Sequence, residues 1–181
     1  MTREHALKLV EQHLGNRNLV KHCLAVEACM KEFAARFGQD PGPWALAGLL
    51  HDLDYETTVD TPSEHTEKTA AMLAEYALDE GIIHAIKAHN LRVVPQSPMD
   101  HSLLAIDPAS GFIIACALMH PDRKLNSLDL PFLKKRFKEK SFAKGASREQ
   151  MAGCARLGME LDEFLSLCLA AMQKTAVELE L

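Results

Sequence analysis

The chain has 181 residues, of which 48% are hydrophobic and 25% charged, and its formal net charge at pH 7 is −5. This length and hydrophobic content are typical of one domain that buries a substantial core. The acidic balance argues against general binding to nucleic acid polymers or anionic membranes, because the overall field would oppose both. We therefore expect a small polar ligand as partner, and a homodimer is compatible with the sequence.

The cysteines carry no disulfide or thiolate-metal signature: their number is odd, no Cys-x-x-Cys pair occurs, and each lies in apolar, helix-like sequence. They are predicted to be buried free thiols, which fits a reducing compartment. The first residues, Met-Thr-Arg-Glu-His, are charged where a secretion signal would need an apolar run. No uninterrupted apolar stretch reaches the roughly 18 residues that span a bilayer. We expect a cytoplasmic protein.

Apolar residues recur at spacings of three and four along the whole chain, whereas alternating strand-like runs are scarce, so we predict an all-α, single-domain helical bundle. Residues typical of helix starts and helix ends predict helices over 2–14 and 18–37, and Gly38 is expected to terminate the second. A short apolar helix is predicted over 44–50, with Pro43 at its first position.

The middle of the chain carries further helix signals. Thr61-Pro-Ser-Glu64 is a capping box that predicts a helix through Tyr76, with His65 in its first turn. Asp79 is placed to cap a helix that ends near His89.

The last part of the chain is also helical by its spacing. Residues 100–119 form a strongly apolar helix in which Pro108 predicts a bend or a boundary beside Asp107. A capping box that begins at Ser147 predicts a helix ending at Gly158, and a final helix covers about 160–179.

Histidines and aspartates occur singly or in pairs on successive predicted helices, which is the pattern of a metal site built inside a helical bundle. The candidates are His22, His51, Asp52, His65, His89 and Asp107. Imidazole and carboxylate ligands together favour one or two divalent ions among Fe, Mn, Mg, Zn, Ni and Co, without distinguishing them.

The His51-Asp52 doublet ends an apolar run, and adjacent residues of a regular helix point about 100° apart. Both side chains can reach one ion only where the helix is ending. A buried doublet of ionisable groups needs a partner, which a metal would supply. Taken alone, the doublet is also compatible with an ordinary helix C-cap followed by a turn.

The order of these residues resembles the HD-domain superfamily of metal-dependent phosphohydrolases over about 15–145. His22 lies in Leu-Val-Lys-His-Cys-Leu-Ala-Val, the doublet in Leu-Leu-His-Asp-Leu-Asp-Tyr, and Asp107 in Leu-Ala-Ile-Asp. The resemblance implies that His22, His51, Asp52 and Asp107 hold a first ion. In a two-metal version, His65 and His89 hold a second ion and Asp52 bridges the pair.

The chain resembles small bacterial HD hydrolases, in which the segment after the distal aspartate reads much like Gly111-Phe-Ile-Ile-Ala-Cys-Ala-Leu-Met and a later one like Lys-Ser-Phe-Ala-Lys-Gly at 140–145. On this basis the HD core covers about 15–145, and C-terminal helices within 147–179 pack on it. Two departures affect the site: the doublet is followed by Leu53-Asp54, where many relatives have glycine at the second of these positions, and Pro108 directly follows the distal aspartate. His84 is the alternative ligand to His89.

The resemblance implies that the chain is an enzyme, a metal-dependent phosphohydrolase. Its substrate would be a small phosphate ester, such as a nucleotide or phosphodiester, and metal-activated water would attack the phosphorus. The predicted catalytic residues are Asp52, Asp54 and Lys68, and the predicted substrate contacts are Lys68 and Arg92. The basic run within 134–144 is predicted to be a solvated helix face, with steering of an anionic substrate as the alternative.

Two other functions fit the same residues. Some HD-domain relatives use a di-iron pair with four histidines and two aspartates to oxidise a substrate with oxygen. The other alternative is a regulatory module that binds a nucleotide without turnover.

Overall fold

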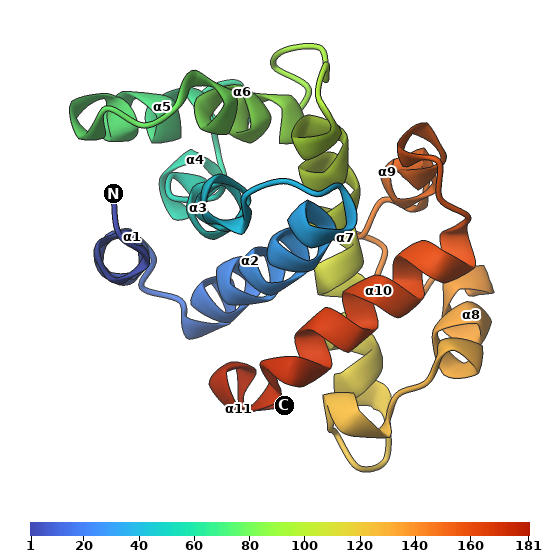
Figure 1. Cartoon of the computed structure of the whole chain (residues 1–181). Coiled ribbons are helices and arrows are strands. Elements are labelled where there is room, and N and C mark those ends of the chain that lie inside the picture. Colours follow the sequence, from blue (N-terminus) through green and yellow to red (C-terminus); the bar gives the residue numbers. More distant parts are fainter.

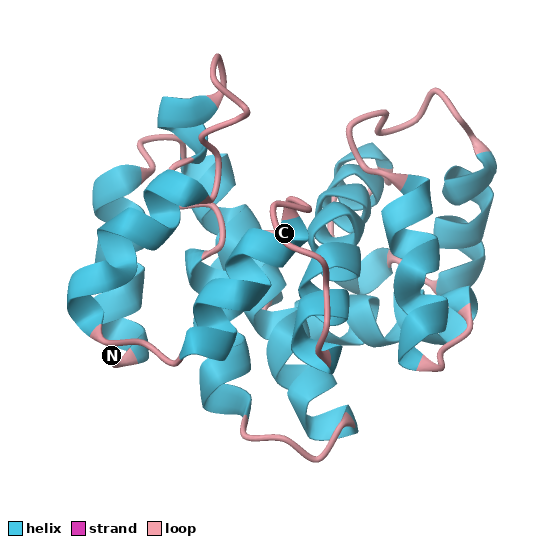
Figure 2. Cartoon of the chain, turned by 90° about the horizontal axis from the view of Figure 1, so that it is seen from above, coloured by secondary structure: helices cyan, strands magenta, loops and turns pink.

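Every regular element of the chain is a helix, in a computed structural model that describes residues 1–181 (Figures 1 and 2). This confirms the all-α prediction. The α-helices are α1 (Arg3–His13), α2 (Arg17–Arg36), α3 (Pro41–Leu50), α4 (Tyr55–Thr58), α5 (Glu67–Leu73), α6 (Glu80–His89), α7 (Pro98–Met119), α8 (Leu130–Lys138), α9 (Arg148–Ala152), α10 (Leu161–Lys174) and α11 (Ala176–Leu179). Three short 3₁₀ helices cover Ala74–Tyr76, Leu125–Ser127 and Gly153–Leu157.

The core lies where α2, α3, α7 and α10 meet, near the centre of the molecule (Figure 1). Apolar residues at helical spacing give α2 and α10 their buried faces, and Phe33 of α2 packs edge-on against Phe164 of α10. The approach of α3 to α2 is close: a Cβ added at Gly48 would lie 3.0 Å from the Glu27 backbone and 2.9 Å from Met30. Glycine at this position brings the end of α3 against α2.

Helix α7 differs from the prediction, because it runs without interruption through Pro108. It begins at Pro98, where Ser97 and Asp100 form a capping box that the sequence analysis missed. An interior proline costs about 3 kcal/mol in an isolated helix, but α7 is buried along much of its length and that burial outweighs the cost. The length and composition of α7 would also suit a helix that crosses a membrane, yet 61% of its most apolar stretch is buried within the fold.

The helix predicted from Thr61 through Tyr76 is wrong at its start. The backbone is in turns until Glu67, because Thr66 adopts a left-handed conformation with a φ of 70°. Within the turns, the amide of Glu64 donates to the Thr61 carbonyl at 2.9 Å. The turn at Thr66 directs His65 toward two aspartates, and those side-chain interactions favour the turn over a continued helix.

Two smaller corrections concern helix ends. Helix α3 begins earlier than predicted, because the Asp40 carboxylate accepts a hydrogen bond from Gly42 N at 2.9 Å and caps the helix before Pro41. The last predicted helix is divided at Thr175 into α10 and α11. The Thr175 hydroxyl donates a hydrogen bond to the Met172 carbonyl at 3.2 Å, a side-chain bond that competes with the helical backbone pattern.

The cysteine thiols should be unreactive in the folded protein. All five are buried, and burial raises the pKa of Cys116 to about 12 and the pKa of Cys154 above its usual value. We expect disulfide-exchange reagents at pH 8 to label the native chain at least about 100-fold more slowly than the urea-unfolded chain. The reagent cannot reach the buried sulfur atoms, and the raised pKa values leave little of the reactive thiolate form. Rapid labelling of one native thiol would contradict this packing of the core.

Candidate metal centre

Four histidines and two aspartates that are distant in the chain converge at one place between the helices. His22 projects from α2, His89 from the end of α6 and Asp107 from α7. His51 caps the end of α3, and Asp52 follows it in the turn. The helix end lets both residues of the doublet face the same point, as the sequence predicted.

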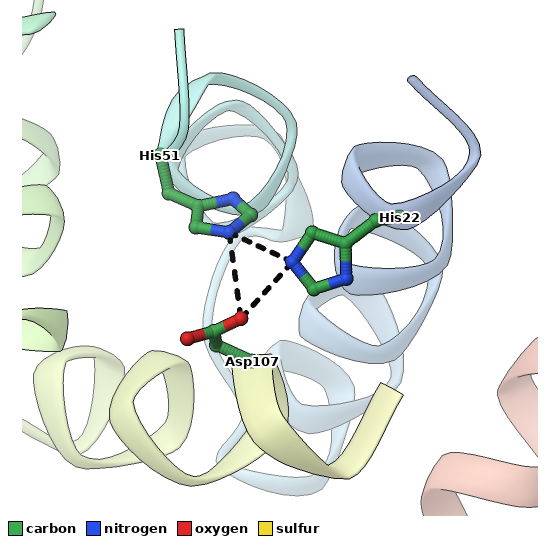
Figure 3. Close-up of side chains that lie close together, drawn as sticks. All are labelled: His22, His51 and Asp107. Carbon is green, nitrogen blue, oxygen red and sulfur yellow. Dashed lines mark hydrogen bonds and ion pairs between the residues drawn. The ribbon is translucent and has the colours of Figure 1, made fainter. Parts of the chain in front are cut away.

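The first half of the centre is a triangle of three side chains from three helices (Figure 3). Nε2 of His22 lies 3.2 Å from Nε2 of His51 and 3.0 Å from Oδ1 of Asp107. Nε2 of His51 lies 3.7 Å from the same aspartate oxygen. Three donor atoms this close together could ligate one cation.

The second half is connected to the first by Asp52, whose two oxygens face opposite ways. Oδ2 lies 3.4 Å from Nε2 of His51 and 3.8 Å from Nε2 of His22. Oδ1 lies 3.3 Å from Nε2 of His65 and 3.4 Å from Nε2 of His89. One carboxylate therefore joins two pairs of imidazoles.

The other ring nitrogen of each histidine is held by a partner outside the centre. Nδ1 of His51 lies 2.8 Å from the Gly48 carbonyl, and Nδ1 of His89 lies 2.6 Å from the Ile86 carbonyl. A carbonyl only accepts, so each Nδ1 is the donor and each Nε2 is left with a lone pair facing the centre. This is how metal-binding histidines are oriented in proteins, so the donor set fits a metal.

The other two histidines are oriented by side chains. Nδ1 of His22 lies 3.0 Å from the Ser110 hydroxyl, which itself donates to the Asp107 carbonyl at 2.9 Å. Nδ1 of His65 lies 2.6 Å from Oδ1 of Asp54. All four imidazoles thus present Nε2 to the same point.

The charges of the centre are strongly coupled. Burial opposes ionisation of Asp52 and Asp107, but the neighbouring histidines outweigh it and hold the pKa of each carboxyl well below its usual value. Burial likewise opposes protonation of His65, yet hydrogen bonds to Asp52 and Asp54 raise its pKa to about 9. One buried and one half-buried carboxylate thus require positive charge beside them, and a divalent cation would supply that charge in place of protons.

Asp54 lies behind the centre. It is buried, and its second oxygen accepts the backbone N–H of Thr69 at 2.9 Å. The bond to His65 and this backbone bond hold the pKa of Asp54 below its usual value against the effect of burial. Asp54 therefore orients the ring of His65 from behind the centre.

The structure does not bring the two predicted phosphate-binding cations to the centre. Lys68 pairs with Glu64 at 2.7 Å on the surface, and Arg92 donates to the Pro62 carbonyl. Neither side chain lines the cavity at the centre. Their contact with substrate stays a prediction that would require both side chains to move.

His84, the alternative to His89, points elsewhere: its Nδ1 lies 2.9 Å from Oδ2 of Asp100, which belongs to the capping box of α7. In the basic segment 134–144, Lys134 pairs with Asp162 at 2.6 Å and Arg136 with Glu139 at 2.9 Å. These pairs tie part of the segment to the protein surface.

A cavity of about 580 Å³ opens over the centre, and the sequence analysis missed much of its wall. Asn90, Gln150 and the turn 143–146 line it beside the predicted ligands, together with Tyr55. Of these lining residues, the turn 143–146 could have been found from the sequence, because it overlaps the segment at 140–145 that resembles other HD hydrolases. Arg148 fixes this turn by donating to the carbonyls of Phe142, Ala143 and Ala146 at 2.7 to 2.9 Å.

Comparison with known proteins bears on the same part of the chain. The model of the HD domain family matches residues 19–112, which contain all six residues of the centre. Ribonuclease Y of Oleidesulfovibrio alaskensis is 32% identical over 96 residues, which is 53% of this chain and 18% of that protein. Ribonuclease Y 2 of Levilactobacillus brevis is 32% identical over 95 residues, covering 52% and 18%.

A third relative, Ribonuclease Y of Sulfurovum sp., is 32% identical over 95 residues, which is 52% of this chain and 19% of that protein. The aligned region is thus less than a fifth of the length of each of these relatives. No solved structure matches the chain significantly.

Proposed function

The chain belongs to the HD domain family, and on that premise we propose that it is a metal-dependent phosphohydrolase that cleaves a phosphate ester, with a phosphodiester as the best candidate. The observation that carries the proposal is the position of Asp52. Its Oδ2 faces His51 and its Oδ1 faces His65 and His89, an arrangement suited to two cations that share one carboxylate.

The residues that would hold the cations follow from the two halves of the centre. His22, His51 and Asp107 lie close enough together to hold one ion, to which Oδ2 of Asp52 would add a ligand. Oδ1 of Asp52 lies close to His65 and His89, which would hold the other ion, and His51 is also close to Asp52 and His89. Divalent ions, when bound, lower the pKa of coordinated water and stabilise negative charge on phosphoryl oxygens. The mixed nitrogen and oxygen ligands do not select among Fe, Mn, Mg, Zn, Ni and Co.

The chain's own residues keep the ligands in place. Asp54 fixes the ring of His65, and the Ser110 hydroxyl links the ring of His22 to the backbone of Asp107. Partners of this kind, once removed, typically cost 10- to 100-fold in metal affinity or activity. The interactions therefore support a rigid ligand set.

The substrate proposal draws on the cavity and on the relatives. A volume of about 580 Å³ is in the usual range for small-ligand sites, about 300–1,000 Å³. The relatives are named ribonucleases, and the bonds between nucleotides in RNA are phosphodiesters. A small phosphodiester fits both observations, whereas the net charge of −5 opposes broad binding of a long polyanion.

The proposal is tested by metal analysis and a substrate panel. We expect protein purified without added metal to contain close to two divalent ions per chain, measured by mass spectrometry of the elements. Loaded with each candidate metal, it should hydrolyse a nucleoside 5′-(p-nitrophenyl phosphate) or a nucleotide, and chelation should abolish that activity. Metal-dependent oxygen uptake without hydrolysis, or tight nucleotide binding without turnover, would overturn the proposal.

A further inference from the structure

A second cavity of about 950 Å³ lies next to the metal centre, and nothing in the mechanism above uses it. One wall is the segment after α6, with Leu91, Val94 and Pro95. The opposite wall is α9 and the 3₁₀ helix that follows it, with Gly153 and Arg156 among the lining residues.

The two cavities are parts of one cleft. Gln150 lines both of them. On one side the chain passes from Asn90 in the first cavity to Leu91 in the second, and on the other from Ala146 to Ser147. The same two segments therefore contribute lining residues to both cavities, and Gln150 is common to the two.

The second cavity combines the groups that a nucleoside requires. Leu91 and Val94 are exposed to 61% and 76%, and these apolar side chains would be covered by a flat base. Ser147 and His101 supply polar groups for sugar hydroxyls, and Arg156 supplies a positive charge for a further phosphate, although the carboxylate of Glu149 also lines the cavity. Its volume is also within the usual range for small-ligand sites.

We propose that the second cavity binds a nucleoside on the far side of the scissile phosphate, so that the preferred substrate is a short oligonucleotide rather than a mononucleotide ester. This inference rests on the proposed function, because the scissile phosphate must lie at the metal centre. Gln150, between the cavities, is then a specificity-determining residue that contacts the substrate on both sides.

Two glycines provide a matched pair of variants. Gly153 lines the second cavity and Gly111 lines the first, and a Cβ added at either position meets no atom within 4 Å. Both lie in helical segments with ordinary backbone angles, so a leucine at either site fills space without backbone strain. Circular dichroism of each variant checks the fold.

The test compares kcat/KM for a nucleoside 5′-(p-nitrophenyl phosphate) with that for a single-stranded tetranucleotide. Wild type should prefer the tetranucleotide. Gly153→Leu should lower the ratio of tetranucleotide to small-ester kcat/KM at least tenfold, whereas Gly111→Leu should lower both values. Val177→Leu, at a position 93% exposed and outside both cavities, should change neither. An unchanged ratio in Gly153→Leu would overturn the inference and leave the proposed function standing.

A binding measurement separates the two proposals if wild type hydrolyses neither compound. Fluorescence anisotropy of a labelled tetranucleotide with metal-loaded protein should then still show binding that Gly153→Leu weakens at least tenfold. Binding without hydrolysis would reject the proposed function but keep the ligand site. Equal affinity of wild type and Gly153→Leu, or no binding by wild type, would reject the second cavity as a nucleotide site.

Discussion

Asp52→Asn should lose both bound metal and hydrolytic activity, with kcat/KM lower by at least about 100-fold. The substitution keeps the shape of the side chain and removes the one negative charge that faces both histidine pairs. Without it, the only carboxylate that faces the Nε2 atoms is that of Asp107, which lies close to His22 and His51 alone. Elemental analysis of the purified variant and initial rates on the p-nitrophenyl ester measure the two effects.

Two other aspartates provide comparisons. Asp107→Asn should halve the metal content, because it affects only the triangle with His22 and His51. Asp122→Asn, whose side chain is 61% exposed, should bind metal and turn over like wild type. Wild-type metal content and rate in Asp52→Asn would show that the carboxylate does not join two cation sites.

Part of the candidate centre could be predicted from sequence. The His51-Asp52 doublet follows an apolar run, and the order of His22, the doublet and Asp107 resembles the HD family, whose model matches residues 19–112. The convergence of these side chains then depends on the packing of α2, α3 and α7, which apolar periodicity also indicates. Helical fold and ligand positions are therefore readable from short-range patterns.

The remaining features depend on contacts between distant segments. The turn at Thr66 exists because Asp52 and Asp54 attract His65, whereas the local sequence favours a helix from Thr61. Pro108 stays inside α7 because tertiary burial outweighs its local cost. Lys68 is close to His65 in sequence, but Glu64, one helical turn before it, pairs with it on the surface.

Gly48→Val should be the most destabilising single substitution on the metal side of the core. A Cβ at this position would lie 3.0 Å from the Glu27 Cα and N atoms, and backbone cannot move aside as a flexible side chain can. Overpacking of this kind typically costs 1–3 kcal/mol, and a branched side chain adds to it, so we expect a loss of about 3 kcal/mol in the free energy of unfolding. For a chain of this size the melting temperature should fall by about 6–12 °C.

Metal binding should be weakened in the same variant, because the Gly48 carbonyl holds Nδ1 of His51 and moves with α3. Gly111→Ala is the matched control: its Cβ meets no atom within 4 Å, and alanine should stabilise α7 by about 0.5–1 kcal/mol. Urea titrations followed by circular dichroism give both free energies, and calorimetric metal titration gives the affinities. If Gly48→Val matched wild type in both measurements, the close approach of α3 to α2 could not be what positions His51.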